Sequence, residues 1–97
     1  MTDNNNSATT TLPGALTIGN VSEAKQQIDS ALAGSGAVVI DASPLKTIDT
    51  AGVQLLVALG KHCRNAGTPL TVNGLQGDVV SFAEGMGISV EMLTGQA

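Results

Sequence analysis

Residues 38–59 read VVIDASPLKTIDTAGVQLLVAL and hold both the longest apolar strand candidate and the longest helix candidate of the chain. The apolar run at residues 37–40 ends on Asp41, a pattern typical of a central strand that is buried on both faces of a parallel sheet. A helix is predicted over about residues 50–65, just before Gly67, which can end it in the left-handed conformation. A strand, a short connection and a long helix therefore organise the predicted fold.

The connection between this strand and this helix is predicted to be a loop over residues 42–49. Pro44 biases the residue before it away from helical geometry, and Leu45 and Ile48 are apolar anchors that can tuck beneath the loop. Beyond the helix, residues 70–72 form another short strand candidate. Because a whole helix separates the two strands, we expect them to pair in parallel through a βαβ crossover.

An earlier helix is predicted over about residues 21–33. Asn20 and Glu23 have capping-box spacing, and the apolar residues that follow recur at helical intervals. Gly34 and Gly36 are expected to end this helix, because glycine takes the left-handed conformation without steric cost.

The amino-terminal part is less regular. Residues 1–8 are polar and unpatterned, and we expect them to be a disordered tail. Residues 10–18 suggest extended structure that Pro13 interrupts, which fits a turn between two short edge strands or one bent strand. The ordered chain is therefore predicted to be one domain over residues 9–94.

The carboxy-terminal part is predicted to contain a third, shorter helix, capped by Asp78 and stopped by Gly87. Four apolar residues share one face of this helix: Val79, Phe82, Ala83 and Met86. Residues 88–93 are expected to add a last packing segment.

Composition argues against several classes of function. Phe82 is the only aromatic residue, so base stacking and sugar stacking are not expected. The net charge of -4 has the wrong sign for binding a nucleic-acid backbone or inserting at an anionic membrane. A single Cys63 and a single His62 leave no disulfide framework and no metal cluster. No apolar run reaches the roughly 18 residues of a membrane span, and we expect a cytoplasmic protein.

The long predicted helix has two distinct faces at about 100° per residue. Its core face comprises Gly52, Leu55, Leu56, Leu59 and Cys63. Thr50, Val53, Val57 and Lys61 lie on an outward flank, with Gln54 on the solvent side. This flank is a candidate docking surface, although Val53 and Val57 can equally be core-edge residues under a neighbouring loop.

Asp49 and Thr50 at the start of this helix allow two interpretations. Both residue types are ordinary helix caps whose oxygens satisfy free backbone amides. Alternatively, the Thr50 hydroxyl is a modification site, because a phosphate there would lie at the positive end of the helix dipole. The phosphate would place about two negative charges on the docking surface, and would oppose a partner fitted to a neutral hydroxyl.

Three stretches resemble a known family: LPGALTIGNVSEAKQQI at residues 12–28, VVIDASPLKTIDTAGVQLLVAL at residues 38–59, and TPLTVNG at residues 68–74, followed by a terminal helix ending in MGI. Together they resemble a STAS domain, the fold of the anti-sigma-factor antagonists, over residues 11–93. The most specific part is residues 48–52, which match the family's D-[ST]-x-G signature. The resemblance implies an α/β fold with a mixed, mostly parallel four-stranded sheet and helices packed against it.

The resemblance also implies a function. The family's reversible phosphorylation site maps onto Thr50, with Asp49 as the matching aspartate. The implied protein is a bacterial, non-catalytic signalling protein in transcription regulation, whose partner is an anti-sigma factor, a serine/threonine kinase or a related signalling protein. The expected partner-binding residues are Asp49, Thr50, Val53, Gln54, Val57 and Lys61.

Two other branches of the family are alternatives. A threonine in place of the commoner serine also resembles the small STAS subunit of the bacterial phospholipid-transport ABC system, whose partner is an ABC ATPase. It resembles as well the stand-alone STAS proteins that are encoded with chemotaxis components.

Catalysis is a third class of function to weigh. Asp41 and Asp49 lie near the carboxyl end of a predicted parallel strand, where α/β folds place ligands. They have no accompanying base, metal cluster or phosphate loop, and residues 34–36 lack the length and the lysine of a P-loop. We therefore expect no catalytic residue, no cofactor and no metal.

Overall fold

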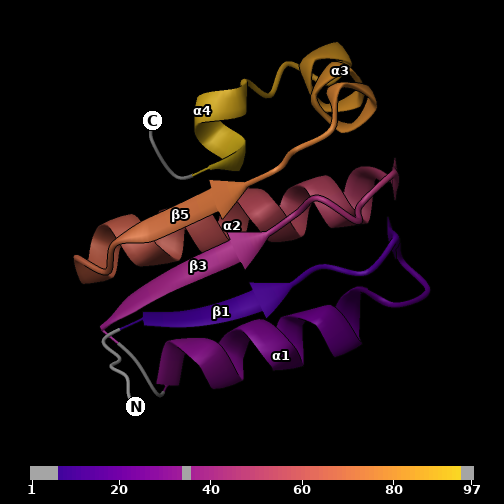
Figure 1. Cartoon of the computed structure of the whole chain (residues 1–97). Coiled ribbons are helices and arrows are strands. Elements are labelled where there is room, and N and C mark those ends of the chain that lie inside the picture. The colour runs from indigo at the N-terminus through magenta and orange to yellow at the C-terminus, as the bar shows by residue number, and fades with distance from the viewer. Residues whose placement is uncertain (1–6, 34–35, 95–97) are drawn as a thin grey trace.

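The protein is built from parallel strands and helices (Figure 1), and its computed structural model describes residues 7–33 and 36–94. Three strands form the larger sheet in the order β1-β3-β5: β1 (Ser7–Thr11), β3 (Ala37–Asp41) and β5 (Leu70–Asn73). Both β1 and β5 pair with β3 in parallel, so the central position of β3 and the βαβ crossover are confirmed.

A second, smaller sheet replaces part of the predicted loop. The short strands β2 (Ala15–Leu16) and β4 (Thr47–Ile48) pair in parallel with each other. The expected single four-stranded sheet is therefore corrected to a three-stranded and a two-stranded sheet, in which every observed pairing is parallel. The chain leaves the larger sheet after β1 and again after β3, and the carbonyl of Gly14 accepts the amides of Lys46 and Thr47 where the second pairing begins.

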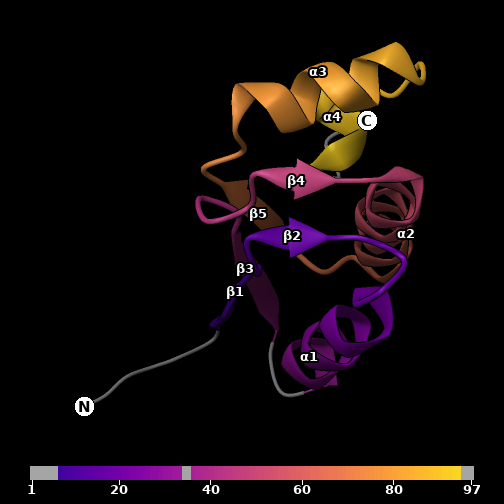
Figure 2. The same cartoon turned by 90° about the vertical axis from the view of Figure 1, so that its right-hand side faces the viewer.

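The two long helices, α1 (Val21–Ala33) and α2 (Thr50–Ala66), cover one face of the larger sheet, and no described helix covers the other face (Figure 2). Val38 and Ile40 of β3 are buried beneath them, whereas Val39 and Asp41 point to the other face and are only partly buried. The predicted burial of this strand on both faces is therefore wrong for the far face. In the parallel register, Val39 lies between Thr9 and Thr71, which are both exposed.

The two long helices have the predicted positions. Helix α1 spans Val21–Ala33 and helix α2 spans Thr50–Ala66, with Gly67 in the left-handed conformation at φ 71°. Strand β1 includes two residues, Ser7 and Ala8, that the sequence analysis assigns to the tail. Of the two glycines predicted to end the first helix, Gly34 lies outside the described residues and Gly36 follows the end of the helix at Ala33.

Asn20 does not form the predicted capping box. Its side-chain oxygen accepts the amide of Thr17 at 2.8 Å, and its side-chain nitrogen donates to the carbonyl of Ala15 at 2.7 Å. The side chain therefore closes the turn that leads from β2 into α1.

The carboxy-terminal helices, α3 (Gly77–Gly85) and α4 (Val90–Leu93), pack beside β4 and α2 respectively. Gln76, rather than the predicted Asp78, is the N-cap residue of α3. The predicted core face of α3 is half correct, because Phe82 and Met86 are 42% and 39% exposed. The buried residues of α3 are Val79 and Ala83.

The core lies between the larger sheet and the helices. It joins apolar residues from the segment that follows β1, from β2, β3 and the loop that follows β3, and from all four helices: Leu12, Leu16, Ala24, Ile28, Val38, Ile40, Ala42, Leu45, Val53, Leu56, Leu59, Cys63, Val79, Ala83 and Leu93. The predicted loop anchors are both in place, since Leu45 is fully buried and Ile48 packs against this cluster.

Gly52 allows α2 to begin directly against the smaller sheet. A Cβ atom at this position would collide with the backbone carbonyl oxygen of Leu16 and would lie 2.7 Å from a side-chain carbon of Ile48. Because backbone atoms cannot move aside as a flexible side chain can, the glycine of the D-T-x-G motif has a steric role here.

We predict that Gly52→Ala lowers the free energy of unfolding by about 1–3 kcal/mol, because the added methyl forces β2 and α2 apart. The control is Gly85→Ala at the end of α3, where a Cβ meets no atom within 4 Å. That substitution should be neutral or stabilising by up to about 1 kcal/mol. Urea denaturation of both variants is the measurement, and equal stabilities would contradict the steric role.

Candidate functional site

Asp49 is the N-cap residue of α2 and also holds a neighbouring turn. One carboxylate oxygen accepts the amide of Gly52 at 3.1 Å, as in an ordinary helix cap. The other oxygen accepts the amide of Ile18 at 3.0 Å, from the turn between β2 and α1. The predicted cap is confirmed, and the same carboxylate fixes a second segment beside the start of the helix.

These hydrogen bonds favour the charged form of Asp49. The amide of Ile18 and, to a smaller extent, the amide of Gly52 hold the pKa of the Asp49 carboxyl below its ordinary value, against a smaller opposing effect of desolvation. Asp41 also has a lowered pKa, chiefly because the hydroxyl of Ser43 donates to it at 2.6 Å. Both carboxylates are thus unprotonated acceptors near neutral pH, which does not suit a general acid.

Thr50 is the first residue of α2 and is exposed. Among residues 7–33 and 36–94, its hydroxyl makes no hydrogen bond. Asp49 performs the capping, so the Thr50 side chain is available to a partner or a modifying enzyme.

Ile18 is a surface residue that is not among the predicted partner-binding residues. It is 76% exposed, the most exposed large apolar residue in the described part of the chain. Its amide is bound to Asp49, so Ile18 lies beside the start of α2 and close to the Thr50 position. The strand alternation after Leu16 suggests a buried residue instead, and only the turn at residues 17–20 reveals its exposure.

The other expected partner-binding residues do not all face solvent. Gln54 and Lys61 are exposed, and Val57 is half-buried. Val53 is only 1% exposed, so its predicted place on the outward flank is corrected to a place in the core. The alternative interpretation of Val53 as a core-edge residue is confirmed, because Val53 belongs to the core cluster and also lines a groove with Met86 and Ile88.

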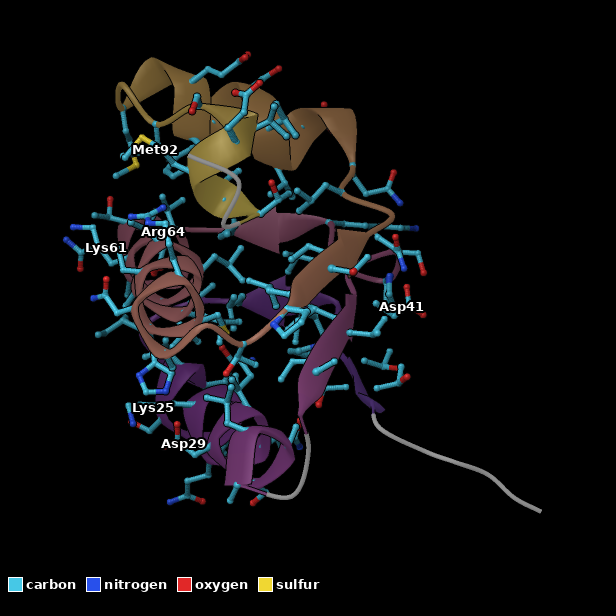
Figure 3. The ribbon with its side chains drawn as sticks, turned by 90° about the vertical axis from the view of Figure 1, so that its left-hand side faces the viewer. Lys25, Asp29, Asp41, Lys61, Arg64 and Met92 are labelled. Atoms are coloured by element: carbon cyan, nitrogen blue, oxygen red, sulfur yellow. The ribbon has the colours of Figure 1, made fainter. Side chains whose placement is uncertain are left out.

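A groove runs between this flank of α2 and the carboxy-terminal segment. Its larger part has a volume of about 340 Å³ and is lined by Val53, Gln54, Val57, Ala58, Lys61, Met86 and Ile88. An adjoining part of about 200 Å³ is lined by Val57, Lys61, Arg64 and Met92. We refer to the two parts together as the α2–α4 groove; Figure 3 shows Lys61 and Arg64 of α2 near Met92 of α4.

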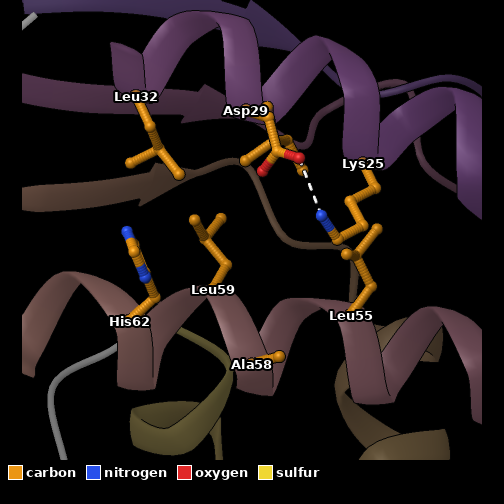
Figure 4. A pocket seen from close by; sticks show the side chains of 8 residues that line it. Lys25, Asp29, Leu32, Leu55, Ala58, Leu59 and His62 are labelled. Atoms are coloured by element: carbon orange, nitrogen blue, oxygen red, sulfur yellow. Dashed lines mark hydrogen bonds and ion pairs between the residues drawn. The ribbon is translucent and has the colours of Figure 1, made fainter.

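A second groove of about 190 Å³ lies between α1 and α2 (Figure 4). Its walls are mainly leucine side chains from the two helices, and His62 stands at its edge. The charged residues in this groove, Lys25 and Asp29, pair with each other at 2.7 Å. It therefore offers no uncompensated charge to orient a ligand.

The part of the chain that the structure describes contains neither a group of metal-ligating side chains nor a membrane-spanning helix. Within residues 7–33 and 36–94, no three His, Cys, Asp or Glu side chains are grouped so that they could hold a metal ion. Within the same residues, no helix is sufficiently long and apolar to span a membrane.

Comparison with protein families identifies the class of protein. A family model described as "Mlab, STAS domain" matches residues 2–94, which is nearly the whole chain. The chain therefore belongs to the STAS domain family, as its D-T-x-G motif and its arrangement of strands and helices indicate. Members of this family are in general non-catalytic and mediate contacts between proteins. No curated protein matches the chain.

We predict that Asp49→Asn destabilises the protein at neutral pH, because asparagine has one acceptor oxygen and can accept only one of the two amides, Ile18 and Gly52, that the carboxylate accepts. The folded-state pKa of Asp49 lies below that of the unfolded chain. The stability that the charged Asp49 carboxylate gives to the folded protein is therefore complete above about pH 4, which is the pKa of aspartate in the unfolded chain. This stability is lost as the pH falls through the lower pKa of the folded state.

Urea denaturation at pH 7 and at stepwise lower pH values measures this effect. The difference in stability between wild type and Asp49→Asn should be largest at pH 7 and should shrink in acid. The control is Asp78→Asn in the first turn of α3, which also removes one carboxylate but at a different position in the protein. A difference that does not change with pH would contradict the role given to the Asp49 charge.

Proposed function

We propose that this protein is a non-catalytic STAS regulatory protein of the anti-sigma-factor-antagonist type, which binds a partner protein through the start and outward flank of α2. The supporting observation is the exposed Thr50 hydroxyl, which has no hydrogen bond within the described residues. Asp49, Gln54, Val57 and Lys61 complete the proposed surface, and Ile18 adds an exposed apolar contact to it. We place the function in a single domain over residues 9–94 and in the bacterial cytoplasm.

Reversible phosphorylation of Thr50 is the proposed switch. A phosphate at the first residue of α2 would lie at the positive end of a 17-residue helix, so the fold can carry it. The same phosphate would add negative charge next to the Asp49 carboxylate and to the apolar Ile18. A partner fitted to the neutral hydroxyl would then meet repulsion and a desolvation cost. The proposed partner is an anti-sigma factor, a serine/threonine kinase or a related signalling protein.

A second candidate is an accessory subunit of a phospholipid-transport ABC ATPase. The threonine at position 50, where the antagonist pattern more often has a serine, favours it. In that function the same surface contacts the ATPase permanently, and Thr50 is a contact residue that is never modified. A chemotaxis-associated STAS protein is the other alternative, and it would use the same surface to bind a different signalling partner.

We predict that Thr50→Glu weakens binding of the native partner about tenfold or more, because the added carboxylate imitates part of the phosphate charge. Under the switch hypothesis, the affinity of Thr50→Ala for the native partner should be close to that of wild type. The measurement is co-purification from the native cells, followed by titration with the purified partner. The matched control is Thr71→Glu, which places the same charge on the exposed face of β5.

The outcomes separate the candidates. Equal binding by wild type, both Thr50 variants and the phosphorylated protein would exclude the switch. Co-purification with a nucleotide-hydrolysing partner, with Thr50 unmodified in the cell by mass spectrometry, would select the transport subunit. Loss of binding in Thr50→Ala as well as in Thr50→Glu would also favour a permanent contact.

A further inference from the structure

We infer that the α2–α4 groove binds an acidic amphipathic helix of the partner protein. This inference rests on the proposed function, because it uses the outward flank of α2, and it extends the contact surface onto the segment after α3 and onto α4. The expected partner helix has apolar side chains on one face and Asp or Glu residues beside them.

The floor of the groove is apolar and adaptable. Val57 and Ile88 are half-buried, and Met86 and Met92 line the two parts of the groove. Methionine side chains have several accessible rotamers and polarisable sulfur atoms, and they are common on surfaces that accept varied apolar partners. Two of the three methionines in the chain are in this groove.

The charges beside the floor are positive, although the protein as a whole is acidic. Lys61 and Arg64 are two of the four basic residues in a chain with a net charge of -4. Both are exposed, and neither forms an ion pair with any residue in the described ranges 7–33 and 36–94. Their partners are therefore expected from outside the chain, and complementary partners are carboxylates.

The spacing of these residues fits a helix as the occupant. Val57, Lys61 and Arg64 follow one another at i, i+4 and i+7 along α2, so they form a row about 10 Å long. The methionines form the opposite wall of the groove. A partner helix that lies between the α2 row and the methionines can place apolar side chains at i, i+4 and i+7. Its acidic residues can then lie beside Lys61 and Arg64.

Selection from a phage-displayed library of 15-residue helical peptides without charge bias tests this inference. Wild-type protein should enrich peptides with Leu, Ile or Met at helical spacing and an excess of Asp and Glu. The best peptide should bind at least about tenfold more weakly to Lys61→Glu/Arg64→Glu, and its affinity for wild type should fall as salt rises. NMR should place the contact at the side chains of Val57, Ile88 and Met92.

The control variant is Lys25→Glu/Lys46→Glu, which makes the same change in net charge with the other two basic residues of the chain. It should bind the selected peptide as wild type does, apart from a small general effect of charge. Circular dichroism and urea denaturation of both double variants show that each is folded. Selection of basic, uncharged or extended peptides, equal loss in both double variants, or binding of anionic lipid vesicles in place of peptides would overturn the inference.

The native partner separates this inference from the proposed switch. If Thr50→Glu leaves partner binding unchanged while Lys61→Glu/Arg64→Glu weakens it, the switch fails and the groove stands. If Thr50→Glu weakens partner binding while the Lys61 and Arg64 double variant binds as wild type, the groove fails and the switch stands.

Discussion

The Asp49 carboxylate is the interaction on which the candidate site depends. It accepts one amide from α2 and one from the turn before α1. The Asp49 side chain therefore joins the start of α2 to Ile18, which lies 31 residues earlier in the chain. Gly52 makes this arrangement sterically possible, because α2 begins against the backbone of β2. Thr50 and Ile18 owe their positions to these two constraints, and the chemistry of the surface is therefore fixed by the same contacts that close the smaller sheet.

The two ends of the outward flank of α2 have different characters. The amino-terminal end combines an unbonded hydroxyl with an exposed isoleucine, which suits a contact that one phosphate can abolish. The carboxy-terminal end combines methionines with two unpaired cations in the described part of the chain. A partner that contacts both ends of the outward flank would gain affinity from the groove, and Thr50 would make its binding sensitive to phosphorylation. Affinity and sensitivity to phosphorylation would then depend on different residues.

Local patterns predicted the main elements well, and long-range contacts account for the differences. The bounds of α1 and α2, the central β3, the parallel β5 and the Asp49 cap follow from periodicity and from residues near them in sequence. The smaller sheet depends on Gly14 meeting Lys46 and Thr47, which no local pattern encodes. The burial of Val53 and the exposure of Ile18 likewise depend on where distant segments lie, so periodicity left two interpretations open for Val53 and did not indicate the exposure of Ile18.

The face of the larger sheet that no described helix covers differs in chemistry from the candidate contact surface. Threonines of β1 and β5 flank Val39 on that face, so its surface is mainly small and hydroxyl-bearing. The candidate contacts all belong to α2 and the segments around it. A partner bound as we propose would contact the helical side of the molecule, so a fluorophore or a tether attached to this face of the sheet would lie away from that partner.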